Sequence, residues 1–256
     1  MEEILGLLIP LSFLVMLVVE HFFAAKKLPK VRFWLLKGLL FFSFTGLVNA
    51  VLPALTASAL AGRTLFNLRG LGTLPGALLG AVVADFFGYW AHRGMHTSQR
   101  VWRWTHQMHH SAERMDLAGM SYSHPFDTLL VFTLTSLATA LLGLSADAAA
   151  LAGFLGYATA VVQHMNLRTP TGIGRIVMRP EAHGLHHERG IHAYNYASFP
   201  IWDILFGTFR NPESFPEQYG FWPGASAKLG EMLIGRDIGR AIPPDSGPDV
   251  AEPDRA

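Results

Sequence analysis

The sequence contains no cysteine, and only 15% of its 256 residues are charged. The absence of cysteine excludes disulfides, Cys-ligated zinc, iron–sulfur clusters and thiol catalysis. Half of the residues are hydrophobic, so a water-soluble globule would have too few charged groups to cover its surface. The formal net charge of +1 says little about partners, and the positions of the charges are more informative than their sum.

Several common functional motifs are also missing. The sequence has no P-loop, no G-x-S-x-G elbow and no complete G-x-G-x-x-G, so it gives no support for nucleotide binding. We expect no nucleic-acid partner either. The Glu-x-x-His motif of soluble di-iron carboxylate bundles does not occur. A zinc metalloprotease would need His-Glu-x-x-His, but Arg93 follows His92, and Ile191 stands where His187-Glu188 would require a second histidine.

What the sequence has in abundance is apolar runs of membrane-spanning length. The five runs cover 4–25, 33–55, 74–92, 126–144 and 146–164. The last two are separated only by Ser145 and would each be about 28 Å long as helices, so this pair can either span the bilayer or re-enter it. Glu2 and Glu3 stand where a signal peptide would be positive, which favours a membrane helix for the first run.

Lysine and arginine are concentrated in alternate connections between these runs. The first connection holds Lys26, Lys27, Lys30 and Arg32, and four arginines lie in 93–125. Four more arginines follow the fifth run up to position 189, whereas 53–73 holds only two. The positive-inside rule then places the N-terminus outside, and the first connection, 93–125 and everything after 165 in the cytoplasm. We therefore expect an integral protein of a bacterial inner membrane.

These features divide the chain into three expected parts. Residues 1–73 form N-terminal transmembrane helices, 74–212 form a catalytic domain, and 213–256 form a C-terminal segment. The end of that segment, 242–256, is rich in proline and acidic residues and is expected to be disordered. The expected fold class is all-α: a membrane bundle of four to five spans with a histidine-rich di-metal cap in the cytoplasm.

The histidines are strongly clustered. Ten of the twelve lie between His92 and His187, and eight of these fall in three short windows. Window 92–96 has the pattern His-x-x-x-His, and windows 106–110 and 183–187 both have His-x-x-His-His. Positions i, i+3 and i+4 share one face of a helix, so each window can direct its imidazoles at one point. A single histidine is usually a hydrogen-bonded core or surface residue, but three windows of matched spacing indicate a metal site.

The number of imidazoles indicates two ions, because one ion accepts at most about six donors and imidazole suits Fe, Zn, Cu and Ni. His124 and His164 lie at the outer ends of the 126–164 hairpin and so reach the same membrane face. The candidate metal ligands are His92, His96, His106, His109, His110, His124, His164, His183, His186 and His187. We interpret His21 as interfacial, and His192 remains ambiguous.

The residues around the windows resemble the fatty acid hydroxylase superfamily in its sterol desaturase branch. The resemblance extends over roughly residues 85–212. It rests on six motifs: Asp85-Phe-Phe-Gly-Tyr-Trp-Ala-His92, Trp104-Thr-His-Gln-Met-His-His110, Ser121-Tyr-Ser-His-Pro-Phe-Asp127, Gln163-His-Met-Asn166, Asn195-Tyr196 and Trp202-Asp-Ile-Leu-Phe-Gly-Thr-Phe209. Ala197 departs from the glycine that usually follows Asn-Tyr.

The resemblance implies two non-haem Fe ions, for which Zn is a possible substitute, and O₂ as co-substrate. It also implies hydroxylation or desaturation of a membrane lipid. Because the sequence contains no haem or iron–sulfur motif, the electrons must come from a separate electron-donor protein. The choice among a sterol, hopanoid, carotenoid, acyl chain or ether lipid stays open, as does the choice between an alcohol and an alkene product.

Asp85 is the candidate catalytic residue outside the histidines. It lies seven positions before His92 and shares its helix face. It can orient a ligand through a hydrogen bond, or make a buried polar contact between helices. We interpret Trp102 and Trp104 as interfacial anchors. The small residues of the third run are interpreted as close helix packing, with lipid entry between the spans as the alternative; they include Gly76, Gly80, Ala81 and Ala84.

Two other classes of protein remain as alternatives. A histidine-rich metal-ion transporter would carry its ligands along a path through the middle of the membrane. A binding or assembly protein with a structural zinc site would need only four ligands. Because the histidines lie at span ends and exceed four in number, the sequence favours an O₂-dependent di-iron lipid hydroxylase or desaturase.

Overall fold

The computed structural model describes residues 2–239, so the tail at 242–256 that was expected to be disordered lies outside the described residues. Within 2–239 the regular secondary structure is helical, and the only β-type pairing is an isolated bridge between Glu188 and Tyr219. The prediction of an all-α fold is therefore confirmed.

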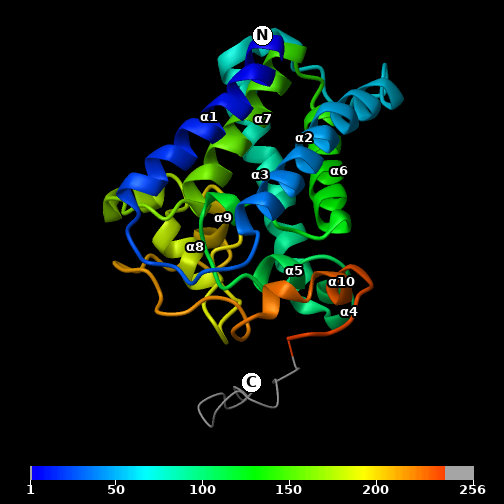
Figure 1. Ribbon diagram of the computed structural model, residues 1–256. Coiled ribbons are helices and arrows are strands. Elements are labelled where there is room, and N and C mark those ends of the chain that lie inside the picture. Colours follow the sequence, from blue (N-terminus) through cyan, green and yellow to red (C-terminus); the bar gives the residue numbers. More distant parts are fainter. Residues whose placement is uncertain (1, 240–256) are drawn as a thin grey trace.

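The upper part of the molecule is a bundle of long helices (Figure 1). These helices are α1 (Glu2–Phe23), α2 (Trp34–Ala59), α3 (Thr73–Thr97), α6 (Pro125–Leu141) and α7 (Ala146–His164). By length and composition α1, α2, α3 and α7 can cross a membrane, whereas α6 has 17 residues and is shorter. The described residues therefore contain four candidate spans, within the predicted range of four to five.

Helix α3 lies at the centre of this bundle and packs against both α6 and α7. A Cβ added at Gly80 would lie 2.8 Å from a methyl carbon of Leu144 and 3.2 Å from Cβ of Ala152. A Cβ at Gly76 would lie 3.0 Å from Cβ of Ala148. These separations leave no room for a side chain, so the small residues of α3 serve the close approach of α3 and α7.

Shorter helices lie beyond one end of the bundle and form a cap (Figure 1). They are α4 (Gln99–Trp104), α5 (Gln107–His110), α8 (Pro180–His186), α9 (Ile201–Leu205) and α10 (Leu229–Leu233), with 3-10 turns η2 (Leu117–Gly119), η3 (Thr171–Arg175) and η4 (Ala225–Ala227). The 3-10 turn η1 (Arg69–Leu71) directly precedes α3, at the opposite end of the bundle. The cap has its own apolar core, which includes Met108, Tyr122 and Met232. The three histidine windows lie at this end of the molecule.

Polar side chains near the ends of α1 and α2 attach these helices to the cap. Glu20 of α1 is buried and accepts hydrogen bonds from the backbone N–H groups of Leu117 and Asn166. Trp34 of α2 donates through Nε1 to Asp116 at 2.8 Å. A buried carboxylate needs such donors to be tolerated, so both helices are held in a fixed position relative to the cap.

Candidate metal centre

The histidines come from four separate helical elements. His92 and His96 lie near the end of α3, and His106, His109 and His110 lie at or within α5. His164 is the last residue of α7, and His183, His186 and His187 belong to α8 and its C-cap. The structure brings nine of the ten predicted ligands into two groups. In each group, one ring nitrogen from every residue lies within 4.8 Å of one ring nitrogen from every other. Group one is His92, His96, His106, His110 and His186, and group two is His109, His164, His183 and His187.

Ring nitrogens in both groups face each other at short range. In group one, Nε2 of His106 lies 2.9 Å from Nε2 of His92, and Nε2 of His110 lies 2.9 Å from Nε2 of His186. In group two, Nε2 of His164 lies 3.2 Å from Nε2 of His109. Two nitrogen ligands at right angles on one ion, each about 2.1 Å away from it, would be about 3 Å apart. The observed separations therefore fit adjacent ligands of a shared metal ion.

In four of these histidines the other ring nitrogen, Nδ1, is held by a hydrogen bond. The pairs are His92 Nδ1 to Tyr196 O at 2.7 Å, His106 Nδ1 to Asp127 Oδ2 at 2.7 Å, His164 Nδ1 to Ala160 O at 2.8 Å, and His186 Nδ1 to Tyr194 O at 2.7 Å. A carbonyl or an ionised carboxylate can only accept, so Nδ1 must be the donor. Nε2 then carries the lone pair, as a metal ligand requires.

Other nitrogens in the groups are buried without a hydrogen-bond partner. They are His96 Nε2, His109 Nδ1, both ring nitrogens of His183, and His187 Nε2. A buried polar atom without a partner costs about 1–3 kcal/mol. Coordination to a metal ion removes that cost for the nitrogen that binds. The all-nitrogen donor set, its burial and its unpartnered atoms together fit two metal ions.

Burial also keeps the imidazoles in the form that binds metal. Desolvation lowers the pKa of His109 to about 3, and it lowers the pKa values of His106 and His110 well below their usual range. Neighbouring imidazoles lower these pKa values further, because a second positive charge close by is unfavourable. The same holds for the pKa values of His183 and His187. These groups are therefore neutral near pH 7, as coordination requires.

His124 is the one predicted ligand that the structure places outside both groups. Its Nδ1 accepts a hydrogen bond from the backbone N–H of Phe126 at 3.1 Å, and it caps the N-terminus of α6. Its Nε2 lies 3.3 Å from the carbonyl oxygen of Leu233. Both ring nitrogens are thus engaged with backbone groups, although the hairpin of α6 and α7 does bring His124 to the same end as His164.

The carboxylate of Asp85 bonds to backbone groups rather than to the imidazoles. Its carboxylate accepts from the backbone N–H groups of Ser198 and Phe199, at 2.8 and 2.9 Å. The loop held in this way contains Tyr196, whose carbonyl oxygen orients His92. Asp85 therefore holds the loop that carries Tyr196. The position of Asp85 in the sequence had predicted either a direct hydrogen bond to a metal ligand or a polar contact between helices, and the structure shows neither.

Three side chains around the groups were given no role at the site from the sequence. Asp127 orients His106 and is part of the Ser121–Asp127 motif, so its position in that motif was an available signal. His192 places Nδ1 2.9 Å from Nδ1 of His110, and burial lowers the pKa of His192 to about 4. Trp102, interpreted as an interfacial anchor, instead packs its ring 4.9 Å from that of His96. Trp102 and His106 are spaced i, i+4 and their rings lie 6.1 Å apart, so this spacing was the signal that Trp102 lies near the histidines.

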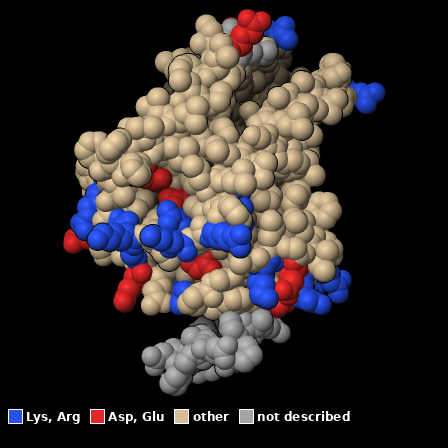
Figure 2. Space-filling model, in the orientation of Figure 1, with Lys and Arg blue, Asp and Glu red and all other residues tan. Residues whose placement is uncertain are grey.

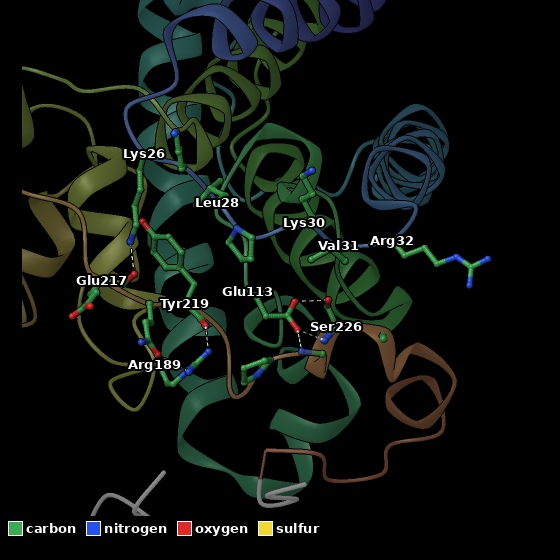
Figure 3. A pocket seen from close by; sticks show the side chains of 16 residues that line it. Lys26, Leu28, Lys30, Val31, Arg32, Glu113, Arg189, Glu217, Tyr219 and Ser226 are labelled. Carbon is green, nitrogen blue, oxygen red and sulfur yellow. Dashed lines mark hydrogen bonds between the residues drawn. The ribbon is translucent and has the colours of Figure 1, made fainter. Parts of the chain in front are cut away.

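Figure 3 shows a pocket that is distinct from the two histidine groups. Its volume is about 430 Å³, and none of its lining residues is a histidine. Basic residues of the connection between α1 and α2 line it, together with Glu113 and Arg189, which follow the second and third histidine windows. Glu113 accepts from the backbone N–H of Gly224 at 2.7 Å. The pocket therefore supplies basic surface near the site but no metal ligand.

Known proteins resemble the part of the chain that carries the two histidine groups. A family model described as fatty acid hydroxylase matches residues 77–208, about half of the chain. Ornithine lipid hydroxylase OlsE of Rhizobium tropici is 34% identical over 143 residues, which are 53% of this chain and 42% of that protein. Sphinganine C4-monooxygenase 1 of Arabidopsis thaliana is 28% identical over 135 residues, 50% of this chain and 51% of that protein.

Methylsterol monooxygenase erg25A of Aspergillus fumigatus is 30% identical over 142 residues, which are 52% of this chain and 46% of that protein. The chain spans about half the length of the curated relatives it matches. No solved structure matches it. The matched region, 77–208, contains both groups of histidines.

Proposed function

Because this chain belongs to the fatty acid hydroxylase family, we propose that it is a membrane enzyme that oxidises a lipid with O₂ at a pair of iron ions. The observation that carries the proposal is the convergence of nine buried or half-buried imidazoles into two groups at one end of an apolar helix bundle. A transporter would need ligands along a path through the bundle. A closed zinc site would need only four.

Bound iron would supply the activation of O₂ for attack on an unactivated C–H bond. The residues of this chain hold and orient the site. The backbone carbonyls of Tyr194 and Tyr196 and the carboxylate of Asp127 accept hydrogen bonds from Nδ1 of three histidines in group one and so direct Nε2 inward. The rings of Trp102 and Tyr196 pack against that of His96, at 4.9 and 5.4 Å between ring centroids.

Metal content is the most direct test of the centre. Group one offers five imidazoles and group two offers four, so purified protein supplied with iron should bind two ions per chain. Zinc can occupy the same nitrogens, so zinc-loaded protein provides an inactive reference. Protein that binds a single ion, or none, would contradict the proposed centre.

The substrate class follows from the bundle and from the relatives. The exposed apolar surface of the spans suits a substrate that diffuses within the bilayer. The relatives are named for ornithine lipid, sphinganine and methylsterol, so the lipid assay should cover acyl, long-chain-base and sterol-like compounds.

Lipid extracts of cells with and without the gene should differ by a species that has gained one oxygen atom or lost two hydrogen atoms. Identical extracts from cells that contain iron-loaded protein would contradict the proposal.

We place the metal centre on the cytoplasmic side of a bacterial inner membrane. Figure 2 shows Lys and Arg gathered in a band across this face of the cap end. Basic residues of the connection between α1 and α2 lie in that band, and Lys26 donates to the backbone carbonyl oxygens of Pro216 and Glu217. The positive-inside rule supports this orientation. Reporter fusions at Gln99 and at the C-terminus should both report the cytoplasm, and opposite signals would reverse the topology.

The electrons should come from a separate donor protein. The sequence has no cysteine with which to hold an iron–sulfur cluster. Turnover by iron-loaded protein in lipid vesicles should therefore depend on an added redox protein and its reductase. Sustained turnover with NAD(P)H alone would show that the chain accepts electrons without a partner.

A further inference from the structure

Helix α9 (Ile201–Leu205) has the reverse of the pattern that a helix in water shows. Ile201, Ile204 and Leu205 are 47%, 49% and 64% exposed, whereas the charged residue Asp203 is fully buried. A surface helix in water faces its apolar side inward and its polar side outward. The outward face of α9 therefore suits an apolar environment.

The position of α9 shows which environment that is. The ring of Trp202 lies 4.8 Å from that of Phe86, and the ring of Phe206 lies 4.9 Å from that of Trp90. Phe86 and Trp90 belong to the candidate span α3, and Trp90 is itself 44% exposed. The apolar surface of α3 thus continues directly onto α9 at the end of the span nearest the cap.

We propose that α9 is embedded in the bilayer interface, with Ile201, Ile204 and Leu205 among the lipid acyl chains. The occupant of this surface is lipid, because the surface is continuous with the lipid-facing side of α3. Helix α9 has five residues and cannot cross the membrane. It lies in the plane of the interface. The hydropathy of the long apolar runs does not reveal this contact with the membrane.

Embedding α9 in lipid has a consequence for the metal centre, and this part rests on the proposed function. Asp203 accepts from the backbone N–H groups of Tyr196 and Ala197, at 2.9 and 2.8 Å. The carbonyl of Tyr196 in turn accepts from Nδ1 of His92 at 2.7 Å. The lipid-facing helix therefore holds the loop that orients a metal-site histidine.

The absence of cysteine makes the depth of α9 directly measurable. Three single-cysteine variants carry a nitroxide label in vesicles: Leu205→Cys in α9, Leu78→Cys on the exposed face of α3 as the bilayer reference, and Ser214→Cys as the water reference. Collision with O₂ reports lipid, and collision with a water-soluble nickel chelate reports water. The label at 205 should resemble that at 78 and collide with nickel several-fold less often than that at 214.

A label at 205 that matches the one at 214 would overturn the proposal. Low collision with both reagents together with spin–spin broadening would assign the surface to a second copy of the chain and would also overturn it. If Leu205→Cys fails to bind metal, Ile201→Cys, exposed on the same face, replaces it. The depth of α9 is measured without turnover, so failure of this inference is distinct from failure of the proposed enzyme activity.

Discussion

The Nδ1 atom of His106 lies 2.7 Å from a carboxylate oxygen of Asp127, a residue 21 positions later in the chain. Both side chains are buried, with 6% and 7% of their side-chain surfaces exposed. Asp127 belongs to the first turn of α6, and its carboxylate fixes the ring of His106 so that Nε2 faces His92. The second histidine window is thus oriented by the helix that follows it.

Replacing Asp127 should therefore weaken metal binding without removing a ligand. Asp127→Asn keeps the size of the side chain but loses the carboxylate that selects the tautomer of His106. We expect metal affinity to fall by about 10–100-fold, measured by titration of metal-free protein. Asp147→Asn is the matched control, because Asp147 occupies the first turn of α7 and is exposed. Equal affinities in the two variants would show that Asp127 does not orient a ligand.

The two histidine groups predict separable losses of metal. His186→Ala removes a member of group one, and His109→Ala removes a member of group two. Each variant should lose tight binding of one ion, so that metal content falls to roughly half, and each should lose turnover because both ions are required. Insertion is driven by the apolar spans, so both proteins should remain in the membrane. His21→Ala, on the exposed side of α1, should behave like the original protein.

Full activity with unchanged metal content in His109→Ala or His186→Ala would show that these groups are not the catalytic site. Loss of both ions from either variant would show that the two groups bind metal as one cooperative unit.

His124 and His192 should behave in opposite ways. His124 binds backbone groups away from both clusters, so His124→Asn, which can still cap α6, should retain both ions. His192 lies 2.9 Å from Nδ1 of His110, so His192→Ala should lower the metal affinity of group one by about tenfold. Both affinities are measured by competition with a chelator. Loss of an ion from His124→Asn would restore His124 as a ligand.

Acid should destabilise the metal-free protein. Burial lowers the pKa of His109 to about 3 and the pKa of His106 and His110 well below the usual value, whereas in the unfolded chain each imidazole has a pKa of about 6.5. The folded state therefore binds fewer protons, and the stability present above pH ~6.5 is lost as the pH falls below it. Each such group contributes a slope of about 1.4 kcal/mol per pH unit.

Thermal unfolding of metal-free protein in detergent, measured between about pH 7.5 and 5, should show this loss. His109→Gln removes one of the titrating groups, so its melting temperature should fall less steeply with acid than that of the original protein. Parallel curves for the two proteins would show that His109 is already protonated in the folded state, against the direction of its pKa shift.

The sequence by itself determined the membrane helices and the identity of most of the metal-binding candidates. Long apolar runs have only one stable environment, and histidines at i, i+3 and i+4 share a helix face wherever that helix lies. Both features are local, so spacing and composition were enough to predict an all-α bundle with its histidines at one end.

Only the tertiary structure decided how the histidines are divided and what orients them. His109 and His110 are neighbours in sequence, yet they belong to different groups because adjacent positions on a helix point in different directions. Asp127 and the carbonyl of Tyr196 became hydrogen-bond acceptors for His106 and His92 through long-range packing. His124 lies outside both groups, and both of its ring nitrogens bind backbone groups. Such contacts depend on where whole helices pack, which the spacing of residues along one helix does not specify.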